Sequence, residues 1–134
     1  MFKLSKKTEY GLLALQYMQH NAERNVATVR EIAEFYNVSQ TLLAKIMQSL
    51  TRNKIIESVQ GAQGGYALRQ PASEVSLAKV LEAIEGPIHI TDCYQNNDCC
   101  VRKEHCTLRH RFTPLQNGII DQLQTMTLAD FFKE

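Results

Sequence analysis

Two short helical segments separated by a tight turn constrain the fold of this chain more than any other feature. Thr28-Val-Arg-Glu31 fits the capping box that begins a helix, and we expect this helix to end near Tyr36-Asn37. Ser39 fits the N-cap of a second helix that ends around Arg52. Such a pair is typical of a helix-turn-helix. The second helix carries an apolar stripe suited to a core, formed by Leu43, Ile46, Met47 and Leu50.

A β-hairpin is predicted directly after the second helix. Ile55–Val59 and Tyr66–Arg69 have strand-like composition, and the turn QGAQGGY between them holds three glycines that permit positive φ values. A hairpin directly after a helix-turn-helix is a wing. Three further helices are predicted over Lys6–His20, Ser76–Glu85 and Cys106–Met126. Pro114 is expected either to begin or to kink the last of them.

The expected fold class is mainly α with a small β-hairpin wing, a winged helix-turn-helix followed by a long C-terminal helix. At 134 residues the chain is expected to be one compact unit. Within it we assign residues 1–86 to the winged helix, 87–106 to a cysteine-rich loop and 107–134 to a dimerisation helix and tail. An apolar stripe along the last helix suggests a partner subunit, and it comprises Leu108, Phe112, Leu115, Ile119, Leu123 and Met126.

Charge is divided unevenly along the chain, although the formal net charge is only +1. Residues 1–70 carry nine Lys/Arg and five Asp/Glu, a net charge of +4, whereas residues 71–134 carry six Lys/Arg and nine Asp/Glu, a net charge of −3. The first half therefore favours a polyanion such as DNA. Arg30, Arg52 and Lys54 are the expected phosphate contacts. The expected base-reading and wing residues are Ser39, Gln40, Thr41, Lys45, Gln48 and Gln60.

All four cysteines lie in one polar segment between Cys93 and Cys106. No apolar run approaches the ~20 residues of a membrane span and no signal-peptide pattern follows the start, so we expect a cytoplasmic protein with reduced thiols. Clustered reduced cysteines indicate metal or redox chemistry. Cys93-x5-Cys99 and Cys100-x5-Cys106 suit an iron–sulfur cluster better than a Cys-x-x-Cys zinc knuckle, and we expect three of the four to bind.

Other interpretations of the cysteine segment stay open on the residues alone. A structural zinc would use cysteines with His105 or His110, and a thiol–disulfide switch would need no metal. A catalytic cysteine activated by His105 or His110 would make the chain an enzyme, but no phosphate loop, oxyanion motif or acid/base pair accompanies it. On the residues alone, Glu9 is a solvated acid at the start of the first helix, where it favours the helix dipole.

The chain resembles the Rrf family of winged-helix transcription regulators, in particular its IscR-like and NsrR-like iron–sulfur sensors. The resemblance covers almost the full length and rests on LSKKTEYGLLAL, VREIAEFYNVSQTLLAKIMQSL, SVQGAQGGYAL, SLAKVLEAIEG, a trailing three-cysteine spacing and TLADF. It implies a homodimer paired through a long C-terminal helix and set for a palindromic operator in double-stranded DNA. It also implies a repressor with no catalytic activity that reports redox state, nitric oxide or iron supply.

The resemblance also implies the cluster ligands. Counting backward from Thr127-Leu128 makes Cys106 the third cysteine, which favours Cys100 over Cys99 as the second and leaves Cys93 as the first. The fourth ligand is a His in IscR-like members, but this chain has Arg109 at that position. His110, one residue later, and His105 are the nearby alternatives. In NsrR-like members it is an acid on the first helix of the other subunit, which is Glu9 here and is favoured. Three thiolates and a carboxylate favour a four-iron over a two-iron cluster.

The chain departs from the family pattern at two DNA-facing positions. Gln60 stands where IscR-like members often have Arg, which weakens electrostatic reading of the minor groove. Ala44 offers no polar group on the predicted recognition helix. Both departures leave the operator sequence open.

Overall fold

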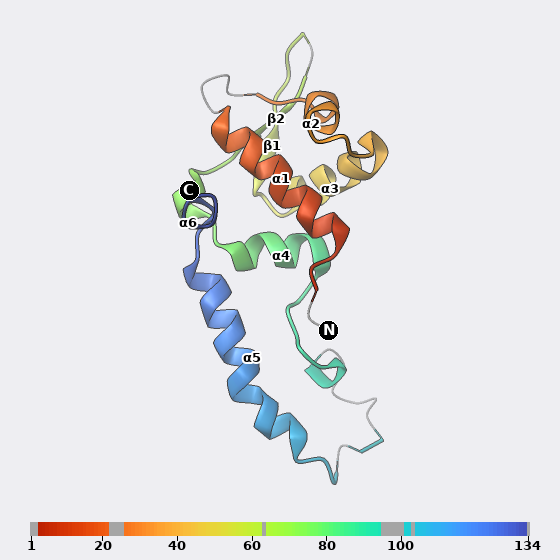
Figure 1. The fold of residues 1–134 in the computed structure, drawn as a ribbon, viewed down its shortest axis with the longest axis vertical. Helices are drawn as coiled ribbons and strands as arrows, with labels where there is room; N and C mark the ends of the chain where they lie inside the picture. The colour runs from red at the N-terminus through yellow and green to blue at the C-terminus, as the bar shows by residue number, and fades with distance from the viewer. Residues whose placement is uncertain (1–2, 22–25, 63, 95–100, 103, 134) are drawn as a thin grey trace.

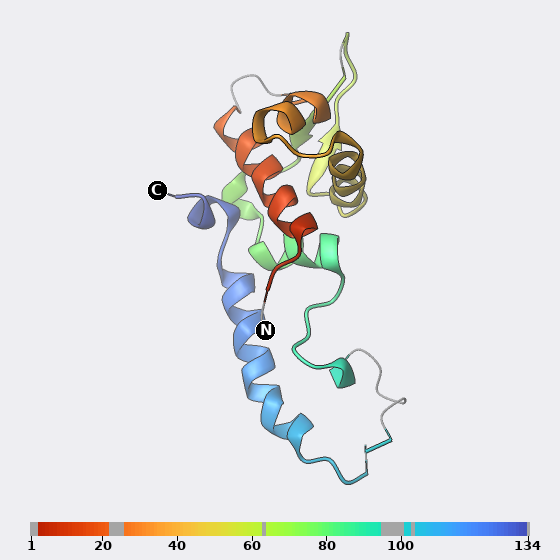
Figure 2. The same ribbon diagram turned by 45° about the vertical axis from the view of Figure 1, so that its right-hand side comes forward.

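The computed structural model describes residues 3–21, 26–62, 64–94, 101–102 and 104–133. Helices α1 to α4 and the hairpin form one body, and α5 extends away from it (Figures 1 and 2). The last helix, α6, returns to that body. The elements are α1 (Lys6–His20), α2 (Val29–Tyr36), α3 (Gln40–Arg52), β1 (Ile56–Ser58), β2 (Tyr66–Leu68), η2 (Ala72–Glu74), α4 (Leu77–Glu85), η3 (Asp92–Tyr94), α5 (Leu108–Thr125) and α6 (Leu128–Phe131).

Serine and threonine caps begin the helices of the winged-helix body. Thr28 Oγ1 accepts a hydrogen bond from the Glu31 amide at 3.1 Å, and Ser39 Oγ accepts from the Leu42 amide at 3.2 Å. Both caps were predicted. Asn37 ends α2 in the left-handed conformation with φ 54°, which turns the chain toward α3. The helix-turn-helix is therefore specified by local sequence signals.

The predicted apolar stripe of α3 forms the centre of the core. Leu43, Ile46, Met47 and Leu50 are between 0% and 3% exposed. The stripe packs against α1 and α4, and Gly11 lies where the three helices meet. A Cβ at Gly11 would lie 2.5 Å from Ile84 Cδ1 and 3.2 Å from Ile46 Cγ2, so the glycine permits this close approach.

The wing is a two-stranded antiparallel hairpin in which Ile56 pairs with Leu68 and Ser58 with Tyr66. Its strands are shorter than predicted. Ala27, just before α2, adds a bridge, because it exchanges two backbone hydrogen bonds with Tyr66 at 2.9 and 2.8 Å. Gly65 has φ +146°, and a Cβ there would lie 2.3 Å from Val26 Cγ1. Glycine at this position lets the hairpin lie against the chain that leads into α2.

The C-terminal part differs from the prediction in two ways. Pro114 lies inside α5, which begins at Leu108, so the alternative in which this proline begins the helix is wrong. The sequence also did not predict α6. Leu128 is fully buried, and its amide donates to the Val75 carbonyl at 2.9 Å. The chain end is therefore part of the core of the winged-helix body.

In the part of the chain that the structure describes, none of the helices is both long and apolar enough to cross a membrane.

Candidate DNA interface and cysteine site

The face of α3 opposite the core is polar and exposed. Gln40, Thr41, Lys45 and Gln48 are all exposed, and they lie where a recognition helix would meet base edges. Ala44 on the same face is half-buried. Ser39 is also exposed, but its oxygen caps α3, so only its hydroxyl hydrogen is left to donate.

The cationic residues expected to contact phosphates differ in their surroundings. Arg30 Nε lies 3.0 Å from Glu34 Oε1 in an ion pair whose side chains are 76% and 68% exposed. Such a pair contributes little stability and leaves the guanidinium accessible. Arg52 Nη2 donates to Ser49 Oγ at 3.2 Å, and Lys54 is exposed in the turn before β1. Gln60 is exposed on the wing.

Two of the four cysteines fall within the described residues, and both are half-buried free thiols. Cys93 lies in the 3₁₀ turn η3, where a loop was predicted, and Cys106 directly precedes α5. Cys99 and Cys100 lie outside the described residues. Thr91 Oγ1 lies 2.9 Å from Cys93 Sγ, so the hydroxyl and the sulfur are hydrogen-bonded. The sequence pattern did not single out Thr91.

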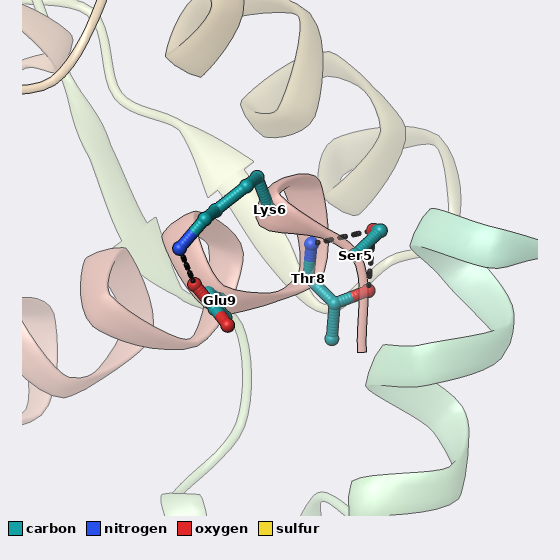
Figure 3. Close-up of polar contacts among 4 residues, drawn as sticks. All are labelled: Ser5, Lys6, Thr8 and Glu9. Atoms are coloured by element: carbon teal, nitrogen blue, oxygen red, sulfur yellow. Dashed lines mark hydrogen bonds and ion pairs between the residues drawn. The ribbon is translucent and has the colours of Figure 1, made fainter. Parts of the chain in front are cut away.

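Glu9 lies in the first turn of α1 with its side chain 43% exposed (Figure 3). Lys6 Nζ donates to Glu9 Oε2 at 2.9 Å, and this hydrogen bond and the charge of Glu9 raise the pKa of Lys6. The exposed pair is weak, so the carboxylate can exchange its partner at little cost. Glu9 therefore satisfies the accessibility that a ligand shared between subunits needs.

The other side of this first turn faces α4. The carboxylate of Glu85, the last residue of α4, accepts hydrogen bonds from the hydroxyls of Ser5 and Thr8, the latter at 2.6 Å. Hydrogen bonds from Ser5 and Thr8 lower the pKa of Glu85, because they favour the charged carboxylate. Thr8 is fully buried, and its amide donates to Ser5 Oγ at 3.3 Å (Figure 3). This link fixes the start of α1, and hence Glu9, relative to α4.

The two histidines near the last cysteine occupy different places. His105 is exposed before α5, whereas His110 is exposed in the first turn of α5 next to Arg109. Among the residues that the structure describes, no three His, Cys, Asp or Glu side chains gather closely enough to hold a metal ion. Within one chain, Cys93, Cys106 and Glu9 are therefore not brought together.

Helix α5 is unusual because Gln116 is the only buried residue among its 18 residues. Leu108 and Leu115 are 56% and 51% exposed, while Phe112, Ile119 and Leu123 are half-buried. Much of the predicted apolar stripe thus remains accessible in a single chain. In both views the N-terminal part of α5 lies away from the winged-helix body (Figures 1 and 2).

A helix-turn-helix, a hairpin wing and a long C-terminal helix together define a winged-helix transcription regulator. The chain belongs to the Rrf2 family, described as iron-dependent transcriptional regulators, which it matches over residues 4–134. It is accordingly a regulator and not an enzyme.

Similar proteins support this assignment along almost the whole chain. The HTH-type transcriptional regulator NsrR of Oceanobacillus iheyensis is 30% identical over 131 residues, which cover 97% of this chain and 89% of that protein. A transcriptional regulator of Listeria innocua superposes with a TM-score of 0.82 at 26% identity, covering 98% of this chain and 87% of its own. The oxidized form of Staphylococcus aureus CymR has a TM-score of 0.76 at 26% identity, covering 99% and 98%.

Proposed function

We propose that this chain is a dimeric repressor whose affinity for a palindromic operator is controlled by an iron–sulfur cluster. The observation that carries the proposal is the pair of half-buried free thiols, Cys93 in η3 and Cys106 shortly before α5, in the segment between α4 and α5. Thiolates are the usual ligands of iron–sulfur clusters, and the description of the family as iron-dependent agrees with such a site.

The proposed ligands are Cys93, Cys100 and Cys106 of one subunit and Glu9 of the other. A four-iron cluster bound there would supply the sensitivity to redox state, nitric oxide or iron supply. Carboxylate is a harder ligand than thiolate and is displaced more easily, so Glu9 is the ligand that a signal would release. Cys99, His105 and His110 are secondary candidates.

The proposed dimer interface is the apolar stripe of α5. Leu108 and Leu115 are more than half exposed, and a second copy of the helix would remove them from water. Two-fold symmetry would place two winged helices on half-sites of a palindromic operator. It would also bring Glu9 of one subunit toward the cysteines of the other.

The route from the ligand to DNA runs through α1. Glu9 lies on α1, and α1 packs directly on the recognition helix α3 around Gly11 and Ile46. Release of Glu9 would detach α1, which stays linked to α4 through Glu85, from the other subunit and let α1 and α3 move relative to that subunit. We expect a coupling of roughly 1–3 kcal/mol between ligand state and operator affinity.

Within the operator complex, Gln40, Thr41, Lys45 and Gln48 would read base edges. Arg30, Arg52 and Lys54 would contact phosphates, with Ser39 and Gln60 as further contacts. Substituting Lys45 with Ala should then weaken operator binding and, if Lys45 contacts phosphate, reduce the salt slope by about one. Gel shifts at several salt concentrations measure both effects.

The decisive experiment is anaerobic purification followed by iron, sulfide and visible absorption measurements. Iron and sulfide in equal amounts, lost in Cys93→Ser and Cys106→Ser, would support the proposal. Comparing Cys99→Ser with Cys100→Ser identifies the second ligand. Oxygen-free protein without iron or sulfide, which binds its operator equally in every redox state, would refute it.

Glu9→Ala tests the fourth ligand, with Glu34→Ala as the matched control. Each acid forms an exposed ion pair within its own helix, Glu9 with Lys6 and Glu34 with Arg30, but only Glu9 is a proposed ligand. The cluster should be lost faster in Glu9→Ala alone, while both variants keep the melting temperature of the parent. Equal cluster lifetimes in the two variants would exclude Glu9.

A thiol–disulfide switch without metal is the second candidate function. It is favoured by the similarity to S. aureus CymR, a structure solved in an oxidized form. In this case iron-free protein treated with a mild oxidant would change its operator affinity, and a reductant would restore it. Mass spectrometry of the oxidized protein would then show a disulfide that includes Cys93 or Cys106.

A further inference from the structure

Gln116 is the one buried side chain of α5, and it is polar. It is 5% exposed, whereas most of the apolar residues around it on α5 remain accessible to water. An amide in such a place is costly unless both of its ends are hydrogen-bonded. The function of the family does not explain why this position carries glutamine.

Both ends of the Gln116 amide are satisfied by one segment of backbone. Its Oε1 accepts from the Ile90 amide at 2.8 Å, and its Nε2 donates to the Ile88 carbonyl at 2.7 Å. These two bonds replace the pairing that a neighbouring strand would supply. Ile88 and Ile90 also line an apolar groove of about 690 Å³ together with Ile119 and Leu123. An apolar setting strengthens the two hydrogen bonds.

The two bonds close a loop that contains all four cysteines. The segment held by Gln116 ends at Ile90, shortly before Cys93, and Gln116 itself follows Cys106 on α5. Fixing both ends of this loop lowers the conformational entropy that the cysteines lose when they gather around a metal. Thr91, next to Ile90, then holds the Cys93 sulfur at 2.9 Å.

We propose that Gln116 is a positioning residue that holds the Ile88–Ile90 backbone on α5 and thereby pre-arranges Cys93 for the thiolate site. This inference rests on the proposed iron–sulfur function. Glutamine is required because the side chain must accept from one backbone group and donate to another. Methionine has a similar length but accepts only weakly and cannot donate, and an ionised glutamate cannot donate either.

The test compares Gln116→Met and Gln116→Glu with Gln122→Met, a substitution at an exposed position of the same helix. In iron-free protein, hydrogen exchange at the Ile90 amide should accelerate about tenfold or more in Gln116→Met and stay unchanged in Gln122→Met. In protein loaded anaerobically, iron release to a ferrous chelator should be about tenfold faster in Gln116→Met. Melting of the winged-helix body should be the same in all variants.

In Gln116→Glu, lowering the pH should restore the hydrogen-bond donor that the parent glutamine provides. At neutral pH its ionised carboxylate should behave like Gln116→Met toward the Ile88 carbonyl. Burial raises the pKa of such a carboxyl, and once protonated it regains a donor. The ionised carboxylate still accepts from the Ile90 amide but repels the Ile88 carbonyl, which should open this segment. The ratio of Ile90 exchange between Gln116→Glu and the parent should therefore lie above one at neutral pH and fall toward one on acidification, a change that Gln116→Met cannot show.

The outcomes separate the two proposals. Iron release within twofold of the parent in Gln116→Met, despite faster exchange at Ile90, would overturn the positioning role and leave the cluster proposal intact. Parent protein that never holds iron would overturn both. Faster iron release in Gln116→Met with an unchanged melting temperature would support the positioning role.

Discussion

The winged-helix body (residues 3–86 with α6) and the arm (residues 87–125) differ in how they bury their side chains. Among the residues that the structure describes, every fully buried large side chain lies in the body, including Leu43 and Met47 of α3. The arm buries only Gln116 in its long helix and leaves Leu108 and Leu115 more than half exposed. The body therefore buries most of its apolar pattern within the chain, whereas the long helix of the arm leaves much of its apolar pattern accessible, as the proposed dimer requires.

Helix α5 packs against α4, and further contacts join the C-terminal end of the arm to the body. The Leu77 amide donates to the Met126 carbonyl at 2.8 Å, and Leu128 anchors α6 in the core. Within the arm, Gln116 joins α5 to the Ile88–Ile90 backbone. An element with few buried apolar contacts opens at a lower free energy than a core element. Helix α5, which buries only Gln116, is thus expected to open at a lower free energy than α3.

The largest expected effect comes from truncating the same residue type in both regions. Leu43→Ala should lower the free energy of unfolding by about 2–5 kcal/mol, because Leu43 is fully buried in the body. Leu115→Ala should change it by less than about 1 kcal/mol in dilute protein, since Leu115 is 51% exposed. Urea unfolding measures both values.

Leu115→Ala should affect dimerisation more than it affects the stability of the single chain. Leu115→Ala should raise the dimer dissociation constant by roughly tenfold, measured by sedimentation, because it removes apolar area from the proposed interface. A Leu115→Ala protein that dimerises like the parent would show that the stripe of α5 is not the interface. A large loss of monomer stability in this variant would show that the arm packs on its own chain.

A smaller effect is expected for two glycines. Gly65→Ala should destabilise the wing by about 1–3 kcal/mol, because φ is +146° and the added Cβ would lie 2.3 Å from Val26 Cγ1. Gly118→Ala in α5 should stabilise the helix by about 0.5–1 kcal/mol, because no atom lies within 4 Å of the new Cβ. Thermal unfolding reports both, and operator binding should fall only in Gly65→Ala.

The sequence predicts the body well because its signals are local. The bounds of α1 are those predicted, and α3 begins after the predicted cap Ser39. The features that were not predicted join distant segments. Glu85 binds Ser5 and Thr8 at the start of the chain, and no local spacing indicates such a link.

The candidate site is predictable as a set of residue types, but not as an arrangement. The cysteine spacing indicates metal or redox chemistry, and Glu9 is accessible as the resemblance requires. Gln116 and Thr91 escaped notice because a lone polar residue in an apolar stripe has no periodic signature. The assembly of ligands is expected to need two subunits, and one chain cannot encode that geometry in its local pattern.

A pH-dependent effect is expected where α1 meets α4. Hydrogen bonds from Ser5 and Thr8 lower the pKa of Glu85 below its ordinary value of 4.5. A carboxylate with a lowered folded pKa contributes stability that is present above pH 4.5 and is lost as pH falls through the folded pKa. Glu85→Gln should therefore cost roughly 1 kcal/mol or less near neutral pH, since Glu85 is exposed.

The difference between parent and Glu85→Gln should disappear in acid. Urea unfolding near neutral pH and below the folded pKa measures the change. Glu82→Gln, at another exposed position of α4, serves as the control and should show no such pH dependence. A Glu85→Gln cost that persists undiminished in acid would mean that the charge of the carboxylate is not what links α1 to α4.

The smallest effect concerns the sulfur itself and depends on the proposed cluster. Thr91 Oγ1 lies 2.9 Å from Cys93 Sγ, and once the sulfur is a thiolate ligand it can only accept, so the hydroxyl must donate. Hydrogen bonds to cluster sulfurs favour the reduced state and raise the potential. Thr91→Val should therefore lower the potential by about 40 mV, the one-electron equivalent of roughly 1 kcal/mol, in anaerobic titrations. Thr91→Ser retains the hydroxyl and should keep the parent potential, whereas a shift in Thr91→Ser without one in Thr91→Val would mean that the methyl group and not the hydrogen bond sets it.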